Sequence, residues 1–190
     1  MKTTYNKYLL IILITMFFSC KAQQILPLNT LMENIPQNAY VKDLSNELVP
    51  YIGTYKANYQ GNEITLFITK EENKLTKRAG KQFYRDVLNT KFIVKGSSNT
   101  ILQDTKNNNL QTNTIYSTKI RSYDNSIILY YNGTNCSVGW GNIFIKKISN
   151  TQFSWDYRPD DMIITPGKCP GNPDLTIYLP VTKGLIFTKQ

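Results

Sequence analysis

The feature that most constrains the fold of this chain is a period of two in its apolar residues after residue 50. Ile64, Leu66 and Ile68 alternate with mostly polar residues, and Phe153 and Trp155 begin a second run of the same kind. Because successive side chains of a strand point to opposite faces, such alternation is typical of strands with one buried face. Similar runs, separated by turns rich in Asn and Gly, give about nine expected strands, at residues 51–59, 63–69, 90–95, 115–121, 126–132, 142–148, 152–157, 175–179 and 184–189.

These strands follow one another through short turns, and no amphipathic helix of three turns competes with them. We therefore expect an all-β fold, an antiparallel up-and-down meander of about 8–10 strands that closes as a barrel, with a β-sandwich as the alternative. The chain has 190 residues, enough for a single domain of this kind, which we place at residues 43–190. A short helical turn at 43–49, with Asp43 as its N-cap, is expected before the first strand.

The first residues carry a targeting pattern. Lys2 and Lys7 precede an apolar run at 9–18, which ends in Ser19-Cys20. The run is shorter than the roughly 20 residues needed to cross a bilayer, and it has the length of the apolar part of a signal peptide. A small residue directly before a cysteine resembles the bacterial lipobox, which implies lipidation of Cys20. We expect a signal peptide at 1–19 and a lipidated tether at 20–42; an ordinary signal peptide with an incidental cysteine is the alternative.

A lipid on Cys20 would make a membrane the first partner of the protein. No acidic run follows this cysteine, so we expect the outer membrane with its periplasmic face favoured and the cell surface as the alternative. After export, Cys136 and Cys169 form an even pair in an oxidising compartment, where disulfides persist. We predict a structural disulfide between them. It would pin the Pro-rich loop expected at 159–173; a second long loop, rich in Asn and Gln, is expected at 97–114.

The sequence contains no histidine. This excludes the Ser-His-Asp triad, Cys–His pairs and His-ligated zinc. Asp156, Asp160 and Asp161 are close together, but their spacing is not that of a calcium loop, and we interpret them as solvated acids at a strand end. We expect no catalytic residue, no cofactor and no metal site.

Positive charge is concentrated between residues 70 and 95. Eight basic side chains stand there against three acidic ones, whereas the chain without its signal peptide carries a net charge of +7. A solvated hairpin with lysines along an edge strand explains this pattern, and attraction to an anionic lipid surface is the functional alternative. Nucleic acid is not expected as a partner, because we expect the protein to be exported.

Aromatic residues are concentrated in the second half of the chain. A barrel interior lined by such rings can hold an apolar or amphiphilic ligand, and the alternative is that the rings fill the core. The candidate ligand-binding residues are Tyr130, Trp140, Phe153, Trp155 and Tyr157.

Gly53-Thr54-Tyr55 directly follows the expected helical turn. It resembles the start of lipocalin-type barrels, where Gly-x-Trp opens the first strand; here Tyr55 stands in place of the Trp. In that pattern an Arg near the last strand packs on the Trp. The last expected strand carries Lys189, together with Lys183 just before it, and neither is a clear counterpart of the Arg.

A second resemblance covers most of the mature chain. The segments Tyr51–Tyr55, Ile64–Leu66 and Ser149–Phe153, behind the lipobox, are similar to a family of small flavobacterial lipoproteins of unknown function. The resemblance implies an envelope location and an all-β fold, and it implies no activity. We expect a non-catalytic, lipid-anchored barrel that binds a small apolar or amphiphilic ligand. The alternative is an envelope protein-interaction module that acts through its loops and basic hairpin.

Overall fold

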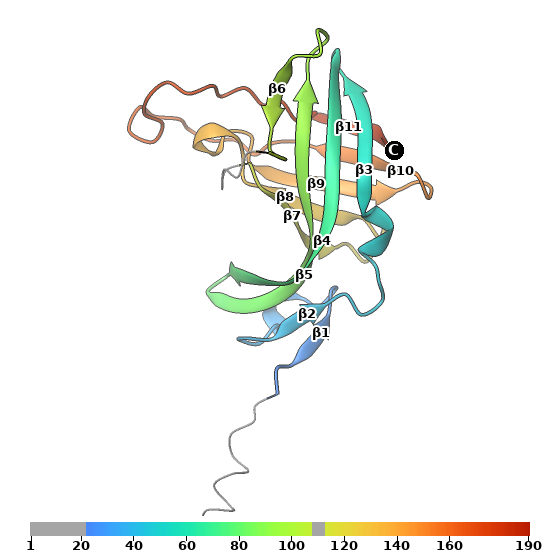
Figure 1. Ribbon diagram of the computed structural model, residues 1–190. Coiled ribbons are helices and arrows are strands. Elements are labelled where there is room, and N and C mark those ends of the chain that lie inside the picture. Colours follow the sequence, from blue (N-terminus) through green and yellow to red (C-terminus); the bar gives the residue numbers. More distant parts are fainter. Residues whose placement is uncertain (1–21, 108–112) are drawn as a thin grey trace, which may run out of the picture.

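The computed structural model describes residues 22–107 and 113–190 (Figure 1). The expected signal peptide, Cys20 and part of the Asn-rich loop therefore lie outside the described residues. Within the two described ranges, no helix is long and apolar enough to cross a membrane.

Eight antiparallel strands close into an up-and-down barrel. Each pairs with the next one in the chain, β11 returns to β3, and β7 pairs back to β5. The predicted all-β meander is thus confirmed, as a barrel and not as a sandwich. The barrel strands are β3 (Gly53–Tyr59), β4 (Asn62–Arg78), β5 (Lys81–Lys95), β7 (Ile115–Ile120), β8 (Ile127–Tyr131), β9 (Gly141–Lys147), β10 (Gln152–Tyr157) and β11 (Thr182–Lys189).

Aromatic rings form a continuous chain of contacts through the barrel interior. The rings of Tyr55 and Phe153 lie 4.7 Å apart, Phe153 stacks on Phe187 at 5.5 Å, and Phe187 meets Trp155 at 5.4 Å. The chain continues through Tyr157 and Tyr131 to Phe92. All of these side chains are buried, because the alternation along each strand turns them inward.

Residues 22–42 belong to the fold, which differs from the tether that we expected there. Strand β1 (Ile25–Pro27) pairs in parallel with β2 (Tyr40–Lys42), and β2 pairs in parallel with β5. Between them lies a 3-10 turn, η2 (Met32–Asn34). Two strands of three residues carry too little alternation to be recognised, and their pairing depends on residues far away in the chain.

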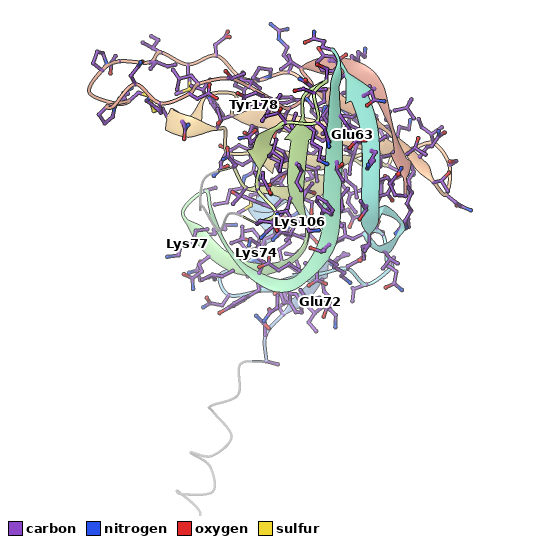
Figure 2. The ribbon with its side chains drawn as sticks, turned by 45° about the horizontal axis from the view of Figure 1, so that its top comes forward. Glu63, Glu72, Lys74, Lys77, Lys106 and Tyr178 are labelled. Atoms are coloured by element: carbon purple, nitrogen blue, oxygen red, sulfur yellow. A yellow bond between two sulfur atoms is a disulfide. The ribbon has the colours of Figure 1, made fainter. Side chains whose placement is uncertain are left out.

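Strands β4 and β5 form one long hairpin, of which one half belongs to the barrel wall and the other half extends away from it. The first half of β4 and the second half of β5 belong to the barrel wall. The pairing is irregular between Glu71 and Lys74, and beyond this point the hairpin curls away beneath the barrel (Figure 1). Figure 2 shows Lys74 and Lys77 on the curled half and Glu63 on the barrel half. An irregularity of this kind bends the strand that carries it.

A buried carboxylate fixes the bend. Asp86 is 1% exposed and accepts hydrogen bonds from the hydroxyl of Tyr40 (2.5 Å) and from the backbone amides of Asp43 and Asn73 (both 3.0 Å). Lys70 lies between the two acids, with Nζ 3.3 Å from Asp43 and 4.0 Å from Asp86. Asp43 caps the chain that follows by accepting from the amide of Glu47, but the helix expected there is only the 3-10 turn η3 (Val49–Tyr51).

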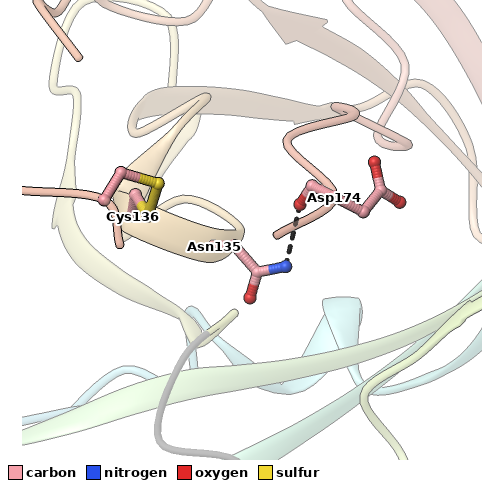
Figure 3. Close-up of a disulfide and its surroundings, with 4 residues drawn as sticks. Asn135, Cys136 and Asp174 are labelled. Carbon is pink, nitrogen blue, oxygen red and sulfur yellow. Dashed lines mark hydrogen bonds between the residues drawn. A yellow bond between two sulfur atoms is a disulfide. The ribbon is translucent and has the colours of Figure 1, made fainter. Parts of the chain in front are cut away.

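The predicted disulfide is confirmed. Cys136, in the 3-10 turn η4 (Asn135–Ser137), is bonded to Cys169, with a Cα–Cα distance of 5.5 Å (Figure 3). Next to it, Asn135 donates to the carbonyl of Asp174 at 2.8 Å. The segment 175–179 has no strand partner and belongs to the long loop that the disulfide holds. The short strand β6 (Ile101–Asp104), by contrast, pairs with β5 inside the stretch that we expected to be a loop.

Candidate functional site

A cavity of about 540 Å³ lies outside the barrel, between its wall and the curled half of the hairpin. It exists because β5 pairs with β7 at two positions, Asn89 with Tyr116 and Thr90 with Ile115, and then follows the hairpin away from the barrel. The space between the diverging strands is a wedge. Its walls come from η2, β4, β5, β7 and β8.

The floor of the cavity is aromatic. Tyr116 and Tyr130 are cross-strand neighbours on the outer face of β7 and β8, with ring centres 6.0 Å apart. They point outward because Ile115, Leu129 and other neighbours in these strands point into the core. The buried side chains of Phe83 and Ile35 also line the cavity and complete its apolar surface.

Arg85 lies at the narrow end of the wedge. It is 7% exposed, and its Nη1 donates to the backbone carbonyl of Thr118 at 2.7 Å. Thr118 is the extra residue of an irregularity in the pairing of β7 with β8, which turns this part of the strand. Burial, and after it the positive charge of Arg78, lower the pKa of the Arg85 guanidinium to about 10, so the group stays charged at neutral pH.

The rim of the cavity is basic. Lys77, Arg78 and Lys119 are exposed and join Arg85 in the lining, against the single carboxylate of Glu33. Among the described residues, none of these four basic side chains has a carboxylate within 4.0 Å. Other bases of the hairpin are neutralised: Lys70 pairs with Asp43, and Lys74 pairs with Glu71.

Lys81 holds the outer wall of the cavity in place. Its Nζ donates to the backbone carbonyls of Met32, Glu33 and Ile35, at 3.2, 2.9 and 2.9 Å. The turn η2 is thereby fixed to the tip of the hairpin. The N-terminal segment is thus a structural wall of the site.

The structure separates the five side chains that we predicted as ligand-binding. Tyr130 lies in the floor of the cavity. Phe153, Trp155 and Tyr157 point into the filled barrel, where the Trp155 indole donates to the carbonyl of Pro180 at 3.0 Å. Trp140 is half-buried beside η4. Whether any of these side chains contacts a ligand stays a prediction.

Sequence reasoning missed most of the cavity. The sequence does not identify Arg85, Phe83 or Tyr116 as binding residues, because nothing in their local context distinguishes them from other residues of basic or aromatic strands. The available clue was the excess of bases between residues 70 and 95, together with the alternation of Phe83 and Arg85, which places both side chains on one face.

A second cavity, of about 850 Å³, lies against β9 and β10 and is lined by Asp156, Asp160 and Asp161. Asp156 accepts a hydrogen bond from the amide of Gly184 at 2.6 Å. Throughout the described part of the chain, no three acids or cysteines are placed to hold a metal ion together. Nearby, the guanidinium of Arg121 lies over the Phe144 ring and is paired with Asp124.

Comparison with known proteins places the chain in a family. No curated protein matches it, and no solved structure does. A family model matches residues 1–149, a range that includes η2, the long hairpin and all the strands that line the first cavity. The chain belongs to this family, which is described as a family of unknown function (DUF6705).

Proposed function

We propose that this protein is a non-catalytic, lipid-anchored binding protein of the cell envelope, which holds a small amphiphilic molecule in the cavity between its barrel wall and the curled half of its hairpin. The observation that carries the proposal is one cavity with an apolar floor and a basic rim. Its volume of about 540 Å³ lies within the roughly 300–1,000 Å³ of small-molecule sites. Convergent polar groups on apolar walls are the usual form of such sites.

The outer cavity suits this role better than the barrel interior. The interior is occupied by the ring chain from Tyr55 to Phe92, and a ligand there would have to displace closely packed side chains. The floor formed by Tyr116 and Tyr130 already lies open beside the hairpin. A ligand can cover these rings without disturbing the core.

The proposed lipid anchor on Cys20 would place the same cavity near the membrane. Cys20 precedes Ile25, the first residue of β1, by five positions, and an extended chain of that length spans at most about 18 Å. Because β1 and β2 pair onto the curled half of the hairpin, a lipid on Cys20 would keep this half close to the membrane (Figure 1). We place the protein at the outer membrane, facing the periplasm.

Binding of N-phenyl-1-naphthylamine, an apolar dye that fluoresces on leaving water, tests the proposal. The mature chain with Cys20→Ser, kept non-reduced, is titrated with the dye. We expect saturable binding that Tyr116→Ala and Tyr130→Ala each weaken at least threefold. Tyr123→Ala is the control, because Tyr123 is 77% exposed and does not line the cavity. Equal affinities in all four proteins would refute the proposed site.

A protein-interaction role is the second candidate, and one observation favours it. Met162, Ile163 and Ile164 are exposed on the long loop, and Ile163 is 80% exposed. The loop is held to the barrel by the Cys136–Cys169 bond, so it presents these side chains in a defined place. Site-specific photocrosslinking from position 163 in intact cells would give one discrete product for a dedicated partner and a diffuse smear without one.

A further inference from the structure

We propose that the cavity selects amphiphiles with an anionic head group, and that Arg85, Arg78 and Lys119 bind its oxyanion, a phosphate or a carboxylate. This inference rests on the proposed function, because it names the chemical class of ligand for the same cavity. Its starting point is the buried guanidinium of Arg85, which lines the cavity and has no counter-ion in the part of the chain that the structure describes.

The guanidinium of Arg85 has unused donor capacity. Arginine carries five N–H groups in a planar fork, and among the described residues Arg85 makes one side-chain hydrogen bond, to the carbonyl of Thr118. The neighbouring acid, Asp86, points to the other face of the strand, where Tyr40 and two backbone amides occupy it. Arg85 therefore has no carboxylate partner among the described residues.

A buried charge without a partner is costly, and an anion in the cavity would remove this cost. Burying an ion is unfavourable unless it is paired and hydrogen-bonded. The fork of an arginine matches two oxygens of a phosphate or a carboxylate. The two exposed bases at the rim, Arg78 and Lys119, add positive charge around the same point.

The layout of the cavity sets the orientation of the ligand. The head group lies at Arg85, at the narrow end of the wedge, and the apolar chain covers the rings of Tyr116 and Tyr130. The chain then runs towards Leu31 and Met32 of the N-terminal wall. Glu33, the one acid of the lining, lies in this wall, where its backbone carbonyl accepts from Lys81 at the tip of the hairpin.

Calorimetric titration with three probes separates the parts of this inference. Octyl phosphate has both an anion and a chain, octyl glucoside has the same chain with a neutral head, and inorganic phosphate has the anion alone. We expect octyl phosphate to bind the Cys20→Ser mature chain at least tenfold more tightly than either of the others. The preference over octyl glucoside should fall as salt is added, because rim charges are screened.

Three variants test which basic side chains cause the preference for octyl phosphate. Arg85→Gln should weaken the binding of octyl phosphate at least tenfold and weaken the binding of octyl glucoside far less, so that most of the preference between the two is lost. Lys119→Gln should reduce the preference without affecting folding, because Lys119 is exposed. Arg158→Gln removes the same charge from an exposed arginine of the other cavity and should change nothing.

The outcomes distinguish the inference from the proposed function. If the two octyl compounds bind equally in all variants, the anion selectivity is wrong and the binding of amphiphiles stands. If inorganic phosphate binds as tightly as octyl phosphate, the site takes a free anion and the amphiphile proposal fails. If Arg85→Gln unfolds the chain, the Lys119→Gln result decides: an unchanged preference would overturn the inference.

Discussion

Lys189, in the last strand of the barrel, lies with its Nζ 5.8 Å from the centre of the Tyr55 ring in the first strand. Gly53 leaves the space for this contact, since a Cβ at position 53 would lie 2.5 Å from Cε of Lys189. Lys189 and Tyr55 are also backbone partners in the pairing of β11 with β3 that closes the barrel. The Nζ of Lys147 lies 5.6 Å from the centre of the same ring, so two ammonium groups lie near it.

This arrangement predicts that Gly53→Ala destabilises the protein. Gly53 has a φ of 145°, a region that side chains rarely adopt, and the new methyl group would displace Lys189 from the ring. Such strain costs about 1–3 kcal/mol, and we expect a matching fall in the urea midpoint. Gly167→Ala is the control, because nothing lies within 4 Å of its Cβ position. Equal midpoints for both variants would show that the barrel end tolerates the change.

The lowered pKa of the Asp86 carboxyl group predicts that the protein loses stability in acid. Burial disfavours its charged form, but the hydrogen bond from Tyr40, two backbone amides and the charge of Lys70 outweigh this and lower its pKa below the ordinary 3.8. A carboxylate with a depressed pKa stabilises the fold fully above the pKa of the unfolded chain. That stabilisation is lost as the pH falls through the lower pKa of the folded state.

Asp86→Asn tests this dependence. We expect a loss of about 2–4 kcal/mol at pH 7, since an NH₂ group replaces one of the two oxygens that accept from buried donors, and a flatter decline of stability between pH 5 and pH 2. Urea unfolding across this range measures both. Asp161→Asn, at an exposed position of the second cavity, should keep the wild-type curve. A parallel decline in wild type and Asp86→Asn would contradict the assignment.

The disulfide should stabilise the loop that it anchors. Replacing both Cys136 and Cys169 by Ala should lower the free energy of unfolding by about 2–4 kcal/mol. Limited proteolysis should then cut the Pro-rich stretch at 159–173 first. Reductant should bring the wild type to the same stability and leave the double variant unchanged. Resistance of the double variant to the protease would mean that contacts such as Asn135 with Asp174 hold the loop alone.

Lys81 should control the cavity through its outer wall. Lys81→Met removes three hydrogen bonds to the carbonyls of 32, 33 and 35, so we expect faster amide exchange over 25–42 and weaker binding of the naphthylamine dye. Lys95→Met, at the barrel end of the same hairpin, is the control. Faster exchange with unchanged dye affinity would place the dye outside this cavity.

Cys20 should carry the anchor. Cys20→Ser should abolish incorporation of an alkyne-labelled palmitate in cells and move the protein from the membrane fraction to the soluble fraction, because the acyl chains supply the membrane affinity. Cys136→Ser should retain the label, although it breaks the disulfide. Labelling that survives Cys20→Ser would refute the lipobox assignment.

The pattern of apolar residues predicted most of the barrel strands, because each has one face in the core. Ile64–Ile68 lies in β4, and Phe153 and Trp155 lie in β10. The same signal also indicated a strand at 175–179, where the structure has an extended loop. Leu179 is buried there, and alternation reports one-sided burial whether or not a neighbouring strand supplies hydrogen bonds.

The sequence by itself determined the all-β class, the meander and the Cys136–Cys169 pair, since these follow from local periodicity, turn residues and a count of cysteines. The tertiary structure decided the cavity. Arg85 and Asp86 are neighbours of opposite charge in the sequence, yet the strand turns them to opposite faces. The bend brings the ammonium group of Lys70 to Asp86, whereas Arg85 donates to the neutral carbonyl of Thr118. Which of the two charges has no ion-pair partner among the described residues depends on side chains brought together from β2, β4 and β7, and no local sequence pattern indicates which side chains those are.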